Sequence, residues 1–152
     1  MRRKEKEITD RTVIESIILR SAVCHLALSE NSRPYIVPLC FGYRDNALYF
    51  HSARNGKKLE ILKKNNKVCF EFDIDHEIVQ AKDPCKWGMK YRSVIGYGKA
   101  SVIDDPESKR SGLNSIVQHY AGSSLTYAEA ILKDTVLIRV EIESMRGKKS
   151  GY

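Results

Sequence analysis

A group of polar and basic residues between positions 51 and 58 has the composition of a phosphate-binding site. His51 and Ser52 end a β-rich segment, and Gly56 precedes the pair Lys57-Lys58, which opens an amphipathic helix. The first turn of a helix carries unpaired amide N–H groups and the positive end of the helix dipole, and both attract an anion. A hydroxyl, an imidazole and two ammonium groups at such a junction therefore favour a phosphorylated ligand.

The lysine pair also has a simpler interpretation, as an ordinary solvated pair on the protein surface. However, two adjacent ammonium groups at a helix start repel each other and oppose the helix dipole, and a bound phosphate would remove that conflict. The sequence has neither a Walker-type glycine loop nor the glycine fingerprint of dinucleotide-binding folds. We therefore predict a phosphorylated cofactor that is not held in the usual nucleotide-enzyme manner.

The hydrophobic pattern of the chain predicts mainly β structure with a few helices. Asp10 is a candidate N-cap for a helix ending near Arg20, with an apolar stripe of Val13, Ile14, Ile17 and Ile18. Strands are expected at Val23–Ser29, Tyr35–Tyr43, Ala47–Ser52, Lys67–Asp75, Tyr91–Ile103 and Val136–Ile142, and helices at Lys57–Lys64, Asp105–Tyr120 and Ala128–Leu132.

The order of these elements predicts one α+β domain over residues 1–152, an antiparallel β-barrel with helices packed outside. The segments 35–43 and 47–52 are expected to form a hairpin, residues 76–90 a loop, and residues 146–149 a basic tail. Pro38 cannot donate a hydrogen bond to a sheet and so indicates an edge, bulge or interface position. Gly96 and Gly98 indicate a barrel bend or a close approach of other atoms.

The cysteines, charge and hydropathy limit the class of protein. Cys24, Cys40, Cys69 and Cys85 have no metal-ligand or CxxC spacing, and we expect buried, reduced thiols. No stretch is long and apolar enough for a membrane span, and the first residues lack the apolar centre of a signal peptide, so we expect a cytoplasmic protein. His25, His76 and His119 are not spaced as metal ligands, and no metal site is predicted.

The net charge of +7 raises the question of nucleic-acid binding. The basic residues are dispersed along the chain, and no helix-turn-helix, zinc finger or aromatic RNA-binding signature accompanies them. We therefore expect no nucleic-acid partner, and nucleic-acid binding is the least favoured alternative. It predicts binding to oligonucleotides that depends steeply on salt, with no chromophore.

Four stretches of the chain together resemble the pyridoxamine 5′-phosphate oxidase-like flavoproteins, which bind FMN in a split β-barrel. The stretches are MRRKEKEITD, VPLCFGY, LYFHSARNGKK and KWGMKYRSVIGYGKA, in this order between Met1 and about Tyr120. The likeness is closest to the nitroimidazole-resistance-type branch of that family. The resemblance implies a homodimer with one FMN per subunit, bound in clefts where the two barrels meet.

The resemblance also implies which residues contact the cofactor. Lys57 and Lys58 would bind the phosphate, with Ser52 as a hydroxyl partner. Arg92, Ser93 and Val94 would contribute from a second strand, but neighbouring strand residues point to opposite faces, so either Arg92 or Ser93 could face the cofactor. The backbone contacts to the isoalloxazine edge are implied for Val37, Pro38, Leu39 and Cys40.

Four further residues are candidates for contacts with substrate. The resemblance places His51 at the cofactor site, and we hypothesise that it is catalytic, because an imidazole can bind an anionic substrate or donate a proton near neutral pH. Trp87, Tyr91 and Tyr97 are candidate walls for an aromatic substrate or for the flavin. Their aromatic types are equally consistent with a barrel or dimer core.

The function indicated by the resemblance is an FMN-dependent oxidoreductase with a small acceptor, nitroaromatic compounds included. Oxidation of pyridoxamine phosphate itself is less favoured, because the chain ends RGKKSGY and offers Arg139 and Arg146 but no recognisable match to the C-terminal arginines expected for the substrate's phosphate. The alternative is a non-catalytic protein that carries flavin, haem or another tetrapyrrole on the same fold. The sequence leaves open whether FMN, a deazaflavin or haem is bound, and which donor and acceptor are used.

Overall fold

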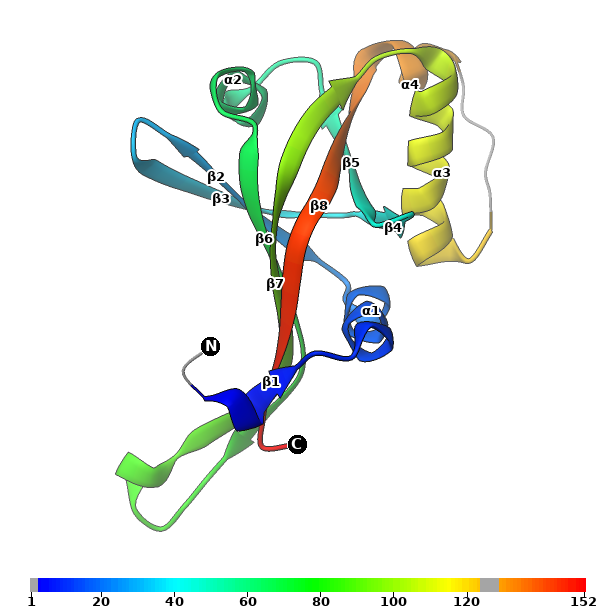
Figure 1. The fold of residues 1–152 in the computed structure, drawn as a ribbon. Helices are drawn as coiled ribbons and strands as arrows, with labels where there is room; N and C mark the ends of the chain where they lie inside the picture. The colour runs from blue at the N-terminus through cyan, green and yellow to red at the C-terminus, as the bar shows by residue number, and fades with distance from the viewer. Residues whose placement is uncertain (1–2, 124–128) are drawn as a thin grey trace.

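The computed structural model describes residues 3–123 and 129–152, and it contains a large antiparallel sheet with helices packed around it (Figure 1). The strand order is β3-β2-β6-β7-β8-β5-β4, and β1 pairs with β8. The strands are β1 (Glu7–Ile8), β2 (Cys24–Glu30), β3 (Arg33–Leu39), β4 (Gly42–Arg44), β5 (Ala47–Ala53), β6 (Lys67–Val79), β7 (Gly88–Ile103) and β8 (Thr135–Ser150). The helices are α1 (Arg11–Arg20), α2 (Lys57–Lys64), α3 (Pro106–Ala121) and α4 (Glu129–Asp134), with short 3₁₀ turns at Lys4–Lys6 and Pro84–Lys86. The predicted mainly β architecture with flanking helices is confirmed.

The core lies on one face of the strongly alternating strand β6. Val68, Phe70 and Phe72 are buried there, as the sequence predicted. The residues between them, including Glu71, point to the opposite face, which we call the outer face of the sheet. Helices α1 and α2 supply the other side of this core through their buried isoleucines and leucines.

The first helix begins and ends where the sequence predicted. The Asp10 side chain accepts a hydrogen bond of 2.8 Å from the Thr12 amide and so caps α1. Ile14, Ile17 and Ile18 are buried, but Val13, which was expected in the same apolar stripe, is exposed. Val13 precedes the buried stripe by one position, which turns its side chain toward solvent.

Gly96 and Gly98 of β7 lie where other atoms approach closely. A Cβ atom on Gly96 would collide with the Phe70 ring, and one on Gly98 would collide with the Glu141 carbonyl group. Gly98 also stands at a register shift between β7 and β8. The prediction of a close approach is correct, and in both cases the approaching atoms belong to this chain.

The predicted hairpin between segments 35–43 and 47–52 is wrong for most of its length. Strand β3 pairs instead with β2, through a tight turn at Asn31 and Ser32, both with positive φ. Only the short β4 pairs with β5, across the turn at Asp45 and Asn46, also with positive φ. Two such turns give two separate hairpins. The edge position predicted for Pro38 is correct, because β3 ends the sheet.

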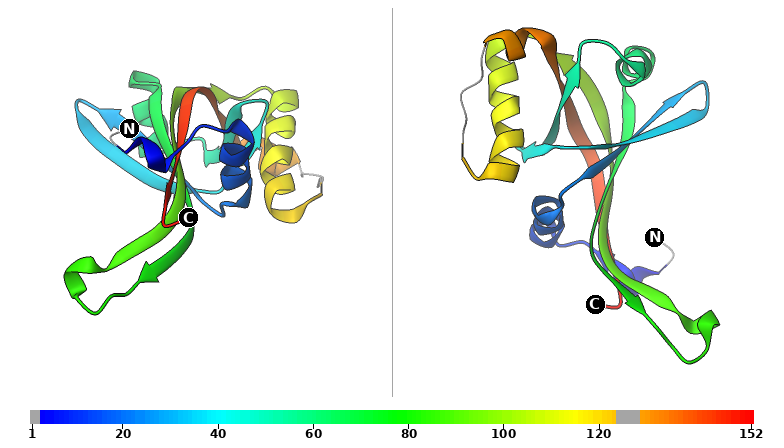
Figure 2. Two further views of the ribbon diagram at one scale, coloured as in Figure 1. Left: turned by 60° about the horizontal axis from the view of Figure 1, so that its bottom comes forward. Right: turned by 180° about the vertical axis from the view of Figure 1, so that it is seen from behind.

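The prediction of a loop over residues 76–90 is correct for residues 80–87 but wrong at both ends. Strands β6 and β7 continue as a paired ladder from Glu77↔Lys90 to Val79↔Gly88. This extension, which we call the β6–β7 arm, projects beyond the rest of the sheet (Figures 1 and 2). Both its faces are exposed, so its sequence lacks the alternation that identifies a half-buried strand.

Two smaller expectations need correction. The basic residues 146–149 form part of β8 and not a tail. All four cysteines are free, but only Cys24 is buried, whereas Cys40 and Cys85 are exposed.

The predicted helix at Ala128–Leu132 corresponds to α4, although Ala128 itself lies outside the described residues. None of the described helices has the length and apolar character needed to cross a membrane.

Candidate functional site

The start of α2 has free donor groups, as expected for an anion site. Gly56 occupies the N-cap position with φ of 133°, and no side chain caps the helix. A positive φ of this size is accessible mainly to glycine, so Gly56 permits the sharp entry into the helix. The amide N–H groups of the first turn therefore have no side-chain acceptor at the cap position.

The two lysines at this helix start have different surroundings. The Lys57 Nζ lies 2.5 Å from Oε2 of Glu30, whose other oxygen lies 2.6 Å from Nζ of Lys64. These two ammonium groups lower the pKa of Glu30 to about 2. Lys58 is half-buried, and burial lowers its pKa. Among the described residues Lys58 has no ion-pair partner, which makes it the ammonium group most in need of an anion.

His51 and Ser52 reach opposite faces of β5. Leu48 and Phe50 belong to the main core, and strand alternation places Ser52 on that same face, to which α2 also contributes. His51 shares the other face with Tyr49, which packs against residues of α3. Ser52 is thus the polar residue of β5 on the side of α2, and His51 is exposed on the opposite side.

The edge strand β3 borders a pocket that reaches α2. This pocket has a volume of about 480 Å³, and its lining includes Glu30, Arg33, Tyr35, Lys57 and Ile61. Sequence reasoning did not select the first three of these residues. No local signal marks them, because the pocket forms only when the β2–β3 hairpin packs beside α2.

The position of β3 in the sheet is compatible with the predicted backbone contacts to a ligand. Val37 and Leu39 pack partly against the core, whereas Pro38 and Cys40 are exposed. Since β3 is the last strand of its side of the sheet, one row of its N–H and C=O groups has no neighbouring strand. A ligand could therefore hydrogen-bond to the backbone here.

The residues predicted on β7 lie elsewhere. Arg92 donates to Oδ2 of Asp75 at 2.5 Å, and its guanidinium group lies 4.0 Å from the centre of the Tyr152 ring. Ser93 is buried and lines a second pocket of about 280 Å³ on the outer face. The Val94 side chain is fully buried in the core, so only its backbone could reach a cofactor.

One chain does not bring these two groups of residues together. Lys99 of β7 pairs with Lys67, which follows α2 closely in sequence, and Ser93 lies six residues before Lys99 in the same strand. At the usual rise of a β-strand this separation is about 20 Å. The residues near α2 and those near Arg92 therefore form two separate groups in one chain.

The predicted aromatic walls are also dispersed. Trp87 lies exposed on the β6–β7 arm, where its indole N–H donates to the Ala81 carbonyl. Tyr91 is half-buried under the Lys148 ammonium group, 5.2 Å from the ring centre. Tyr97 is exposed on the outer face. None of the three packs against His51.

Comparison with known proteins identifies the family. The sequence model of the pyridoxamine 5′-phosphate oxidase family matches residues 10–149. The chain belongs to this family. A crystal structure of a proposed 5-nitroimidazole antibiotic resistance protein from Bacteroides thetaiotaomicron is 35% identical, with a TM-score of 0.85. That match covers 94% of this chain and 86% of the other. None of the curated proteins matches the sequence.

Solved structures of lower sequence identity share the same fold. A flavocytochrome from Azotobacter vinelandii is 18% identical with a TM-score of 0.81, over 97% of this chain and 71% of the other. An FAD- and haem-binding protein from Mycobacterium smegmatis is 19% identical with a TM-score of 0.85, over 97% and 74%. The fold of this pyridoxamine 5′-phosphate oxidase family member is therefore the split β-barrel that the sequence predicted.

Proposed function

We propose that this protein is an FMN-dependent oxidoreductase that passes electrons from a cellular donor, such as a reduced nicotinamide, to a small acceptor. The observation that carries the proposal is the half-buried Lys58, with no acidic partner among the described residues, at the uncapped start of α2. A phosphate group would meet its ammonium group, the amide donors of the first turn and the Ser52 hydroxyl. These groups fit the terminal phosphate of FMN, and FMN, when bound, supplies the redox chemistry.

The separation of the two groups of residues, which we call half-sites, supports a homodimer as the functional form. On the outer face Ile36, Ile95 and Tyr97 are 62%, 47% and 57% exposed, which is an unusual apolar surface for an isolated chain. A second copy packed on this face would cover these residues. It would also bring Ser93 of one subunit, which lies on this face, toward the α2 pocket of the other, so that both half-sites could contact one cofactor.

Nitroaromatic compounds are the acceptor class that we propose, with nitroimidazoles as the first to test. The support is the 35% identity with the proposed 5-nitroimidazole resistance protein over nearly the whole chain. Oxidation of pyridoxamine phosphate has less support. The two arginines near the end of the chain are already paired, Arg139 with Glu141 at 3.4 Å and Arg146 with Glu7 at 3.0 Å.

The second candidate is a carrier that binds flavin or haem without turnover. The observation in its favour is that two solved structures of the same fold are described as a flavocytochrome and as an FAD- and haem-binding protein. An enzyme and a carrier differ in one measurable respect. Only the enzyme undergoes repeated cycles of reduction by a donor and reoxidation by an acceptor.

The test begins with the visible absorption spectrum of freshly purified protein and the mass of the released chromophore. We expect an oxidised-flavin spectrum and the mass of FMN. The flavin should then be bleached by NADH or NADPH without oxygen and restored by added nitroimidazole. A haem band, or a flavin that no donor reduces, would favour the carrier. Protein that is colourless and does not take up added FMN would refute the proposal.

A further inference from the structure

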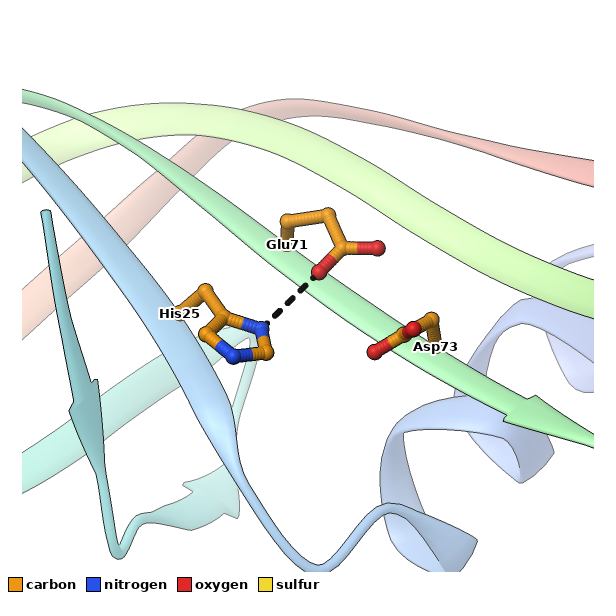
Figure 3. Close-up of side chains that lie close together, drawn as sticks. All are labelled: His25, Glu71 and Asp73. Atoms are coloured by element: carbon orange, nitrogen blue, oxygen red, sulfur yellow. Dashed lines mark hydrogen bonds and ion pairs between the residues drawn. The ribbon is translucent and has the colours of Figure 1, made fainter. Parts of the chain in front are cut away.

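Three potential metal ligands converge on the outer face of the sheet, outside the pocket beside α2. His25 comes from β2, and Glu71 and Asp73 come from β6 (Figure 3). One ligand atom from each residue lies within 4.8 Å of the other two. The His25 Nδ1 and the Glu71 Oε2 are 3.1 Å apart. Sequence spacing predicted no metal site, because His25 lies 46 residues before Glu71.

The sheet register explains this convergence. His25 and Glu71 are directly opposed in the antiparallel pairing of β2 with β6, so their side chains rise from the same face. Asp73 is two residues further along β6 and points to that face as well. Since two rigid strands fix all three positions, the group requires no loop rearrangement to meet an ion.

A second histidine, His76, contacts the carboxylate of Asp73. Nε2 of His76 lies 2.6 Å from Oδ2 of Asp73. His76 can reach back because β6 has a register shift between Ile74 and Glu77, where Asp75 adopts a φ of 58°. Metal-binding carboxylates commonly have such a hydrogen-bond partner, which fixes their orientation.

The electrostatics of the group favour a cation. Among the described residues, Glu71 and Asp73 form ion pairs only with the histidines His25 and His76, and no lysine or arginine neutralises them. Within the described part of the chain, Nε2 of His25 has no hydrogen-bond partner. In the single chain the side chains of His25, Glu71 and Asp73 are 39%, 31% and 38% exposed. They lie on the same face as Ile95, so in the dimer proposed above the ion would bind at the subunit interface.

We propose that His25, Glu71 and Asp73 bind a divalent transition metal of the Zn²⁺ class, with His76 orienting Asp73. An imidazole nitrogen with two carboxylate oxygens suits Zn²⁺ and its neighbours better than Ca²⁺ or Mg²⁺, which prefer oxygen ligands alone. Three protein ligands leave a coordination position for water or a small anion. The site does not depend on the flavin, and either can be measured without the other.

The test is a titration of the tag-free protein, as purified and after treatment with a chelator, with Zn²⁺ in a calorimeter. We expect one Zn²⁺ per chain. His25→Ala and Asp73→Asn should each weaken binding by at least about 10-fold, and His76→Ala by a similar factor through the misorientation of Asp73. Binding should also weaken as the pH is lowered, because protons compete for the imidazole and the carboxylates.

Two further variants keep the result decisive. Glu71→Gln preserves the shape of the side chain, and circular dichroism verifies its fold, so lost affinity there reports the lost charge. His51→Gln removes an exposed histidine outside the cluster and should leave Zn²⁺ affinity unchanged. Substitution with Co²⁺ should give a visible spectrum that His25→Ala abolishes. The proposal is overturned if no saturable site exists, or if His25→Ala and Glu71→Gln bind Zn²⁺ like the unaltered protein.

Discussion

Glu30 and Lys57 form an ion pair of 2.5 Å across 27 residues of sequence, and this pair separates the roles of two adjacent lysines. The carboxylate of Glu30 already neutralises Lys57 and also contacts Lys64. Lys58 has no comparable partner among the described residues, and burial disfavours its charge. The sequence presents the two lysines as equivalent, whereas the structure distinguishes them.

Replacing Lys58 should weaken FMN binding more than replacing Lys57. A hydrogen bond to a charged group contributes about 1.5–3 kcal/mol, so Lys58→Ala should raise the Kd for FMN by at least about 10-fold. Lys57→Ala should have a smaller effect, since part of the Lys57 charge is offset by Glu30. Fluorescence titration of flavin-free protein measures both values. Lys63→Ala, on the exposed side of α2, serves as the control. Equal losses for Lys57→Ala and Lys58→Ala would contradict this assignment.

The ion pairs of Glu30 should make the free energy of unfolding depend on pH under acidic conditions. Its pKa is lowered from 4.5 to about 2 in the folded protein, so its ion pairs stabilise the fold fully above pH about 4.5. This contribution is lost as the pH falls toward 2, where the carboxylate becomes protonated in both states. Urea unfolding across this range should show that the difference between the unaltered protein and Glu30→Gln shrinks with falling pH. A difference that stays constant would show that Glu30 does not act through its charge.

A methyl group at position 96 should destabilise the core. Because the Cβ atom of Gly96→Ala would collide with the Phe70 ring, the ring must shift, and such overpacking costs about 1–3 kcal/mol. Urea unfolding of Gly96→Ala measures the loss. Gly88→Ala is a matched control in the same strand, where the added Cβ meets no atom within 4 Å. Phe70→Leu in the Gly96→Ala background should recover part of the loss. A neutral Gly96→Ala would refute the packing argument.

Charge on the outer face should separate the proposed dimer. Tyr97→Arg combined with Ile36→Lys places two cations on the face that we expect a second copy to cover. Sedimentation should then report a monomer, and FMN should be lost with it, since each site would lack its second half. Leu19→Lys alters another exposed apolar residue, on α1, and should leave both properties unchanged. A charged variant that is monomeric and still retains FMN would show that one chain suffices for the cofactor.

Local signals in the sequence were sufficient for several elements. The alternation in β6, the cap at Asp10, the start of α3 near Asp105 and the Lys57-Lys58 helix start were all correctly predicted. Each depends on residues within a few positions of one another, because strand alternation and helix capping are properties of the local backbone. The family was recognisable for a similar reason, since its motifs are short and keep their order along the chain.

The tertiary structure decided the features that join distant residues. The sequence could not show that β3 pairs with β2, that the β6–β7 arm extends the sheet, or that His25 stands opposite Glu71. Nor could it show that Glu30 reaches Lys57 and leaves Lys58 unpaired among the described residues. Which strand lies beside which, and in what register, depends on how apolar faces pack across the whole chain, and no local pattern contains that information.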